Sequence, residues 1–292
     1  MRKEHLGRIA GYMSCIAALI ITILFPSDAC TRLSKEYPLI ISYYWPVEKG
    51  QNDFYKLNME MPNVIDILSN ESHGSRAVRK HWEKKGKILL NRVYPFRYHK
   101  NETEIYKYFA ENMHQVRGIS IDEILGNKLQ HKNAKILMNV IKKLRINFPD
   151  KIIAVWGSSV WKDKNIPLLE AIRDYADIFI PEFYISEKAA RSKGLVMVNE
   201  RVRQLDVRVP GILKKTVIGI GLYPKMDNDR NVIFREHVLS QIRHLRTDSF
   251  LNKFPGIALY APVYLSPEDQ KWLDLVLMEY FLDSHGSHPA QH

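Results

Sequence analysis

The sequence contains little cysteine, with only Cys15 and Cys30 among its 292 residues. Two cysteines are too few for a disulfide-rich scaffold, and they are too few for a structural zinc site built mainly from thiolates. Long apolar runs are equally scarce, because only residues 9–25 are apolar enough over a sufficient length to enter a bilayer. This single run excludes a membrane protein with several transmembrane helices.

Several motifs of nucleotide-binding proteins and enzymes are also missing. The sequence has no G-x-x-x-x-G-K-S/T phosphate loop, no H-E-x-x-H zinc motif and no G-x-S-x-G nucleophile elbow. Gly219-Ile220-Gly221 lies inside an apolar run and is followed by Pro224, so it does not start a dinucleotide-binding turn. The 11 histidines are scattered, and none ends a predicted strand beside an acidic residue. We therefore expect neither a metal nor a cofactor.

What is present is a globular composition with an excess of positive charge. Hydrophobic residues make up 46% of the sequence and charged residues 26%, which excludes a disordered or fibrous chain. The net charge is +11, from 43 lysine and arginine residues against 32 aspartate and glutamate residues. This excess indicates either an anionic polymer as a partner or simply a solvated basic surface. No aromatic and basic recognition motif occurs, so we expect no nucleic-acid partner.

Residues 1–29 have the pattern of a secretory signal. A basic start precedes the apolar run 9–25, and the small residues Ser27 and Ala29 follow it at the spacing of a cleavage site. Cleavage after Ala29 would make Cys30 the first mature residue, where it could carry a lipid, and the alternative is an uncleaved membrane anchor. We expect an exported protein, either secreted, periplasmic or anchored, that contacts the membrane only through this segment.

Beyond residue 37, a short β-rich apolar run alternates with a polar or amphipathic stretch eight times. This alternation predicts a parallel sheet with right-handed crossovers, and eight units of roughly 30 residues suit a closed (β/α)8 TIM barrel. We therefore assign residues 37–283 to a single α/β barrel domain and residues 284–292 to a flexible tail. The eight predicted strands are Leu39–Trp45, Val64–Leu68, Lys87–Val93, Gly118–Ile124, Lys151–Trp156, Asp177–Pro181, Thr216–Leu222 and Gly256–Tyr260.

Apolar residues recur at helical spacing between several of these runs. Four such stripes occupy residues 134–144, 168–176, 238–245 and 272–280, and a first helix is expected near residues 50–60. The main alternative is an open doubly wound sheet, which would usually have a glycine-rich turn after its first strand. Here that turn reads Tyr43-Tyr44-Trp45-Pro46, without glycine, and so the barrel is favoured.

The order of side chains along each run predicts which of them face the barrel interior. Neighbouring residues of a strand point to opposite faces, and we expect isoleucines to face the helices. This rule turns Ser120 and Asp122 inward and places Asp122 at the mouth, where the chemistry of such barrels collects. Arg92 is expected to point outward or upward. The other inward-facing residues are the small Ser42, Ala154, Gly219, Gly221 and Ala258, which lie deeper in the barrel, and Tyr44, Asn91, Trp156, Tyr223 and Tyr260 towards or at its rim.

The sixth run does not follow this rule. Glu182 has the same parity as Ile178 and Ile180, which we expect to face the helices. Pro181 cannot donate a hydrogen bond to a strand ladder, so it marks a bulge or the end of the strand. Beyond Pro181, parity no longer fixes the direction of the Glu182 side chain.

The predicted mouth contains the groups that glycoside hydrolysis requires. One carboxylic acid must protonate the leaving oxygen, and a second carboxylate must attack the anomeric carbon or activate water. Asp122 and Glu182 follow the fourth and sixth strands, which can bring their side chains across the pore towards each other. Aromatic rings at the rim can stack on the C–H faces of sugars. The sequence therefore predicts a carbohydrate ligand.

The segment Gly118-Ile119-Ser120-Ile121-Asp122-Glu123 resembles the strand-four signature, G-apolar-x-apolar-D, of (β/α)8 glycoside hydrolases. The most similar groups are the α-galactosidase-like clan and the endo-α-1,4-polygalactosaminidase-like barrels. In the α-galactosidase-like clan, an aspartate ending strand four is the nucleophile and a carboxylate ending strand six is the acid/base. The resemblance implies these roles for Asp122 and Glu182. Together with the barrel pattern and the aromatic rim, the two residues lead us to expect an exported retaining glycoside hydrolase that acts on a polysaccharide or glycoconjugate. The sequence departs from that clan by offering glutamate rather than aspartate at strand six.

Other interpretations of these residues stay open. Glu123 could be the catalytic group with Asp122 supporting it, or Asp122 could cap a helix. Glu182 could be an ordinary surface residue, and Arg92 could pair with a neighbouring carboxylate instead of binding substrate. The rim aromatics could simply plug the barrel. For the whole protein, the alternatives are a non-catalytic glycan-binding barrel at the cell envelope and a barrel enzyme for another small anionic substrate.

Overall fold

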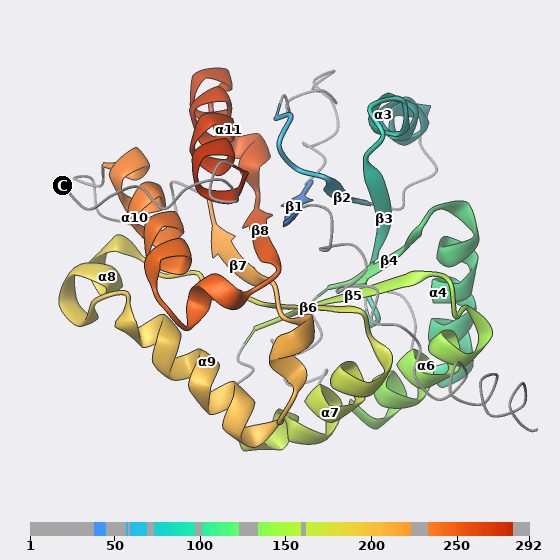
Figure 1. The fold of residues 1–292 in the computed structure, drawn as a ribbon. Helices are drawn as coiled ribbons and strands as arrows, with labels where there is room; N and C mark the ends of the chain where they lie inside the picture. Colours follow the sequence, from blue (N-terminus) through green and yellow to red (C-terminus); the bar gives the residue numbers. More distant parts are fainter. Residues whose placement is uncertain are drawn as a thin grey trace, which may run out of the picture.

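The protein forms a ring of eight parallel strands surrounded by helices, as the computed structural model in Figure 1 shows. The predicted signal segment 1–29, most of the helix expected near residues 50–60, Glu123, Tyr223 and the predicted tail lie outside the described residues. The structure describes residues 38–44, 57, 59–68, 73–96, 101–122, 134–158, 162–222 and 233–282.

Each of the eight strands overlaps one of the eight predicted runs, which confirms the predicted alternation. The strands follow the order β6-β5-β4-β3-β2-β1-β8-β7, and every neighbouring pair is parallel. They are β1 (Leu39–Tyr43), β2 (Val64–Leu68), β3 (Ile88–Val93), β4 (Gly118–Ile121), β5 (Ile152–Gly157), β6 (Ile178–Pro181), β7 (Ile218–Gly221) and β8 (Gly256–Tyr260).

The ring closes between β6 and β7. The backbone N–H of Val217 donates to the carbonyl of Phe179 at 2.8 Å, and the N–H of Phe183 donates to the carbonyl of Gly219 at 3.1 Å. Two isolated parallel bridges at the same place replace a full ladder. The open doubly wound sheet is therefore excluded, and the (β/α)8 barrel is confirmed.

The helices lie outside the strands (Figure 1), as crossovers between parallel strands require. Four of them, α6, α7, α10 and α11, confirm the four predicted stripes. The helices are α3 (His73–Lys84), α4 (Glu102–Gln115), α6 (Ala134–Asn147), α7 (Ile166–Tyr175), α8 (Glu187–Lys193), α9 (Val196–Arg208), α10 (Phe234–Thr247) and α11 (Pro267–Phe281), with short 3-10 turns at η1 (Asp163–Asn165), η2 (Ile212–Lys215), η4 (Leu251–Lys253) and η5 (Pro262–Tyr264). No helix within the described segments combines the length and the hydrophobicity that a membrane span needs.

Helices α4 and α11 begin at N-cap residues whose side chains accept hydrogen bonds from the first helical turn. The Asn101 side chain accepts a hydrogen bond from the Glu104 N–H at 3.0 Å and caps α4. The Ser266 hydroxyl accepts from the Asp269 N–H at 3.1 Å and caps α11. Each cap satisfies a donor that the first helical turn leaves without a partner, which fixes where the helix begins.

Alternate strand residues separate into a barrel interior and a layer beneath the helices. Ile119 and Ile121 of β4 pack in the same buried cluster as Phe109 of α4 and Ile141 of α6. The apolar part of the interior cluster instead comprises Leu39, Ile41, Tyr43, Val64, Leu90, Ile152, Ala154, Trp156, Ile178, Ile180, Val217 and Ala258. Both faces of every strand are therefore buried, as is usual in parallel sheets.

Two glycines allow the strands and their side chains to approach closely. A Cβ on Gly118 of β4 would lie 2.0 Å from the carbonyl oxygen of Ile152, so no other residue fits there without a backbone shift. A Cβ on Gly219 of β7 would meet Ile180 at 3.2 Å and the ring of Trp156 at 3.5 Å. Gly219 thus faces the interior, as predicted, and leaves space for the Trp156 indole.

Candidate active site

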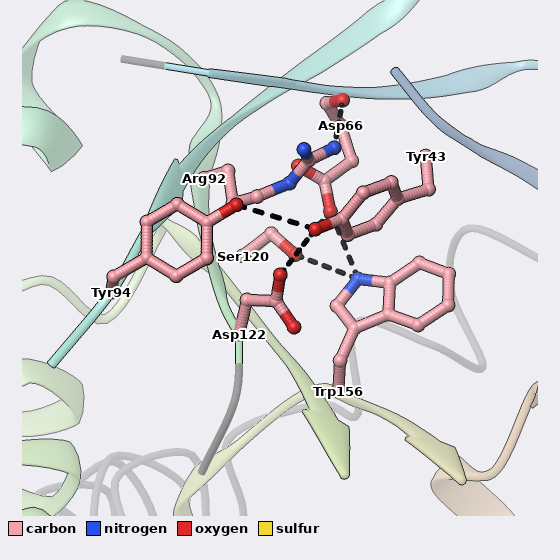
Figure 2. Close-up of polar contacts among 7 residues, drawn as sticks. All are labelled: Tyr43, Asp66, Arg92, Tyr94, Ser120, Asp122 and Trp156. Carbon is pink, nitrogen blue, oxygen red and sulfur yellow. Dashed lines mark hydrogen bonds and ion pairs between the residues drawn. The ribbon is translucent and has the colours of Figure 1, made fainter. Parts of the chain in front are cut away.

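Asp66, at the centre of β2, organises the polar part of the barrel interior. Its carboxylate accepts hydrogen bonds from Arg92 Nε at 3.0 Å, from the Ser120 hydroxyl at 2.7 Å and from the Trp156 indole N–H at 2.9 Å (Figure 2). The side chain is fully buried. Burial raises the pKa of Asp66 to about 6, against the opposing effect of the Arg92 charge. Four neighbouring strands therefore meet at one carboxylate.

Arg92 of β3 lies inside the barrel, fully buried beside Asp66. Its Nη2 donates to the Asp66 carbonyl at 2.9 Å, and its guanidinium carbon lies 3.2 Å from the centre of the Tyr43 ring. Burial opposes the charge of Arg92, but nearby acidic groups, Asp66 first, outweigh it and raise the pKa of Arg92. The expectation that Arg92 points outward or upward is wrong, and its pairing with a carboxylate is the interpretation that the structure supports.

Tyr43 of β1 connects this ion pair to the barrel mouth. Its hydroxyl donates a hydrogen bond to Asp122 Oδ2 and lies 3.3 Å from the Tyr94 hydroxyl (Figure 2). The ring packs edge-on against Trp156 at 5.1 Å and lies 4.8 Å from the ring of Tyr260. Burial raises the pKa of Tyr43, so its phenol stays protonated at neutral pH and can donate.

Asp122 and Glu182 lie at the same end of the barrel. Asp122 directly follows β4, where its N–H donates to the Val93 carbonyl at 3.0 Å, and its side chain is almost fully buried. Glu182 directly follows β6, where its N–H donates to the Gly157 carbonyl at 3.0 Å, and the residue is half-buried. The carboxyl ends of parallel strands form the functional face of (β/α)8 barrels.

Asp122 and Glu182 both affect the pKa values of two tyrosines, Tyr184 and Tyr260. Burial first, and then the charges of Asp122 and Glu182, raise the pKa of Tyr260 to about 12. The pKa of Tyr184 is raised in the same way, by burial first and then by Glu182 and Asp122. The two tyrosine rings lie 4.8 Å apart. Asp122 and Glu182 are therefore both near the same pair of aromatic side chains.

The hydroxyl of Tyr184 is buried and has no hydrogen-bond partner among the residues that the structure describes. A buried hydroxyl without a partner has lost its hydration at a free-energy cost of about 1–3 kcal/mol. Its neighbours Glu182, Asp122 and Tyr260 are the groups of the barrel mouth. Among the described residues, Tyr184 thus carries a hydroxyl that could bond a ligand at this end.

Several predicted orientations agree with the structure. Ser120 and Trp156 bond Asp66 inside the barrel, Ala154 and Ala258 belong to the interior cluster, and Tyr260 packs against that cluster. Asp122 takes the place at the mouth that the parity of β4 predicts. Glu182 also faces this end, because Ile178 and Ile180, which share its parity, fill the interior. The expectation that these two isoleucines face the helices is wrong.

The predictions for Tyr44 and Asn91 are wrong in direction. Tyr44 packs in the cluster beneath the helices, together with Ile40 of the same strand face, and it is Tyr43 that faces the interior. Ser42 shares the parity of Tyr44 and is therefore also misplaced by the prediction. The Asn91 amide donates to the Asn112 carbonyl of α4 at 3.0 Å and so lies between β3 and a helix. Hydrophobicity cannot separate two faces that are both buried.

The sequence prediction missed four residues of this site: Tyr43, Asp66, Tyr94 and Tyr184. A signal existed for Asp66, because a single carboxylate stands in the middle of the apolar run Val64–Leu68. Buried carboxylates are rare without a partner, so this position by itself predicts a paired charge. Within the described ranges, no group of three or more histidine, cysteine, aspartate or glutamate residues is placed to hold a metal ion.

No family model and no curated protein matches this chain. Several solved structures, however, match this chain. An endo-β-N-acetylglucosaminidase from Cordyceps militaris matches with a TM-score of 0.58 and 12% identity, covering 85% of this chain and 93% of that one. Active domain 2 of a thermostable chitinase from Pyrococcus furiosus, complexed with chito-oligosaccharides, matches with a TM-score of 0.60 and 11% identity, covering 87% and 99%.

A thermostable mutant of the xylanase Xyn10A from Cellvibrio japonicus matches with a TM-score of 0.51 and 9% identity, covering 78% of this chain and 88% of the xylanase. At such low identities these similarities concern the fold. The described chain thus has the (β/α)8 barrel that solved glycoside hydrolases share.

Proposed function

We propose that this protein is a glycoside hydrolase in which Asp122 and Glu182 supply the two carboxyl groups. The observation that carries the proposal is that Asp122 directly follows β4 and Glu182 directly follows β6 at the carboxyl ends of the strands, near the paired rings of Tyr184 and Tyr260, whose pKa values both carboxylates raise. Glycoside hydrolysis needs a pair of carboxyl groups on either side of one bond. Aromatic rings beside that pair can stack on a sugar.

The environments of the two carboxyl groups support different roles for them. Asp122 is almost fully buried, and the hydrogen bond that it accepts from the Tyr43 phenol fixes the orientation of its carboxylate. Glu182 is half-buried beside two tyrosines, where a carboxylic acid can exchange its proton with water and with a leaving group. We assign Asp122 as the nucleophile and Glu182 as the acid/base of a retaining mechanism.

A polysaccharide or glycoconjugate is the substrate class we propose. Chitinase and endo-β-N-acetylglucosaminidase barrels are among the structures this fold resembles, which favours glycans as the first compounds to test. The net charge of +11 adds anionic glycans to that set, because a basic surface concentrates polyanions. The pattern of residues 1–29 leads us to propose that the protein is exported, because such polymers occur outside the cell.

Turnover of a glycan panel by wild type, Asp122→Asn and Glu182→Gln tests the proposal. Each substitution keeps the shape of the side chain and removes its acid–base chemistry, so we expect kcat to fall at least about 100-fold. Asp174→Asn on α7 and Glu111→Gln on α4 are matched controls, because both carboxylates are exposed on helices. Equal turnover by all five proteins would contradict the assigned roles.

Two further measurements sharpen this experiment. The anomeric configuration of the first product, followed by NMR, tests the retaining mechanism, and an inverted product would overturn it. Glycan binding by wild type without any turnover at high protein concentration would instead favour a non-catalytic carbohydrate-binding barrel.

A further inference from the structure

We propose that Tyr43 is the positioning residue of Asp122, and that Arg92 and Asp66 hold the Tyr43 ring in place. This inference rests on the proposed function, because it names how the nucleophile of that function is oriented. The three residues come from β1, β3 and β2, and the group they serve follows β4.

The contact between Tyr43 and Asp122 crosses the barrel interior. β1 pairs with β2 and β8, whereas β4 pairs with β3 and β5, so the two residues are not on neighbouring strands. The Tyr43 ring spans this distance, and its hydroxyl donates to Asp122 Oδ2 (Figure 2). A phenol is well suited to such a bridge because the ring fills the interior and the polar atom is at its far end.

The ring itself is held from several sides. The Arg92 guanidinium lies over it at 3.2 Å, the Trp156 ring meets its edge at 5.1 Å and the Tyr260 ring lies 4.8 Å away. Arg92 is fixed in turn by two hydrogen bonds to Asp66, one to the carboxylate at 3.0 Å and one to the carbonyl at 2.9 Å. A side chain packed in this way keeps its hydroxyl at one point, which is what a positioned hydrogen-bond donor needs.

The chemical consequence concerns the charge of Asp122. A donor directed at a carboxylate stabilises the ionised form, and the ionised form is the nucleophile. The proton stays on Tyr43 throughout, so no bond to Tyr43 forms or breaks. Within the ranges that the structure describes, the charged and titratable groups that face Tyr43 or Asp122 are Asp66 from β2, Arg92 from β3, Tyr94 after β3, Tyr184 after β6 and Tyr260 from β8, and Glu182 faces the last two.

The test compares Tyr43→Phe with wild type over a range of pH. The substitution keeps the ring and removes the donor, so we expect kcat to fall about 10-fold to 100-fold while KM changes little. The acidic limb of the pH–rate profile should move to higher pH by about one unit, because the carboxylate loses a hydrogen bond that favours its charge. A merely structural role would lower the folded fraction without moving this limb. Tyr106→Phe is the matched control, since its hydroxyl bonds Asn147 on the helical surface.

A second readout does not depend on turnover. Carboxyl-carbon NMR of aspartate-labelled protein, assigned with Asp122→Asn, follows the titration of Asp122 in wild type and in Tyr43→Phe. We expect the midpoint to rise by about one unit in the variant. A folded Tyr43→Phe protein in which both the midpoint and the acidic limb stay in place would overturn the inference while leaving the proposed function intact.

The opposite failure is also distinguishable. If wild type hydrolyses no glycan but the Asp122 midpoint rises in Tyr43→Phe, the proposed function fails and the positioning role stands. If Tyr43→Phe does not fold, Arg92→Lys replaces it as the test variant. It keeps the positive charge near Asp66 but loses the flat guanidinium over the Tyr43 ring. We expect it to move the midpoint in the same direction by a smaller amount, and an unchanged midpoint would contradict the supporting role of Arg92.

Discussion

The two halves of the barrel interior are built differently. On the side of β1 to β5 the interior holds a buried ion pair, a serine and an indole, joined by hydrogen bonds around Asp66, and a phenol whose ring packs against Arg92. On the side of β6 to β8 the interior is filled by Ile178, Ile180, Gly219 and Ala258. The first half adds these directional bonds to packed apolar residues, whereas the second half is fixed by packing.

The difference shows what the polar half is for. A buried ion pair costs desolvation free energy that its attraction seldom exceeds, so apolar residues would stabilise the barrel as well or better. The apolar half demonstrates that this fold fills its interior without charge. The polar half instead fixes Tyr43 and, through it, Asp122, whereas Glu182 stands above the apolar half and is more exposed. The nucleophile we assign is therefore held rigidly, and the acid/base is left in contact with solvent.

The largest predicted effect comes from breaking the ion pair. Arg92→Met leaves the buried Asp66 carboxylate without its counter-charge, and we expect the free energy of unfolding to fall by about 3–5 kcal/mol. In the apolar half, Ile180→Val removes one methylene and should cost only about 0.5–1.5 kcal/mol. Urea unfolding measures both. The double variant Asp66→Asn/Arg92→Met should be less destabilised than Arg92→Met alone, and a greater loss would contradict the ion-pair explanation.

The second effect is a dependence of stability on pH that only the polar half should produce. The pKa of Asp66 is raised from 3.8 to about 6 in the folded protein, so the folded state binds this proton more tightly than the unfolded state does. Its contribution to stability is therefore present below about pH 4 and is lost as the pH rises to about 6.

Urea unfolding of wild type and Asp66→Asn at several pH values isolates this contribution. The difference in unfolding free energy between the two proteins should change between about pH 4 and pH 6 in favour of the variant, and it should be constant above that range. Ile180→Val, in the apolar half, is the control and should follow wild type at every pH. A difference between wild type and Asp66→Asn that stays constant from pH 4 to pH 6 would contradict the raised pKa of Asp66.

A smaller effect follows from removing one donor while keeping an aromatic ring at the same position. Trp156→Phe deletes the indole N–H that donates to Asp66 at 2.9 Å and lies 3.0 Å from the Ser120 hydroxyl. We expect a loss of about 1–3 kcal/mol from the bond to a charged acceptor and from the smaller ring volume. Urea unfolding measures the loss, and an unchanged midpoint would show that the indole N–H does not support the network.

The strands and their barrel arrangement could be predicted from the sequence, but the direction of their side chains could be predicted only in part. In β4 and β7, isoleucines alternate with small or polar residues, so parity is unambiguous and Ser120, Asp122 and Gly219 are predicted correctly. In β1 the run Leu39-Ile40-Ile41 has no such alternation, and the neighbouring tyrosines after it cannot be told apart. Both faces of a barrel strand are buried, so an apolar residue fits either.

The candidate site depends on contacts between strands that no local pattern encodes. Tyr43 and Asp122 are 79 positions apart, and Asp66 and Trp156 are 90 apart. Local sequence can indicate that a buried aspartate needs a partner, but it cannot say that Arg92 is the partner or that Tyr43 lies over it. Those contacts follow from the closure and register of the whole ring.

The smallest effect on stability should come from Tyr184, and it contrasts with Tyr43. The Tyr184 hydroxyl has no hydrogen-bond partner in the described part of the protein, so Tyr184→Phe should change the free energy of unfolding by less than about 0.5 kcal/mol or increase it. If the hydroxyl instead binds the glycan, KM should rise several-fold on the substrates that wild type hydrolyses. Urea unfolding and steady-state kinetics on the same samples separate the two effects. A loss of stability above about 1 kcal/mol would mean that the Tyr184 hydroxyl is hydrogen-bonded within the folded protein. The side of β6 to β8 would then also contain a stabilising polar contact, and the contrast between the two halves would be weaker.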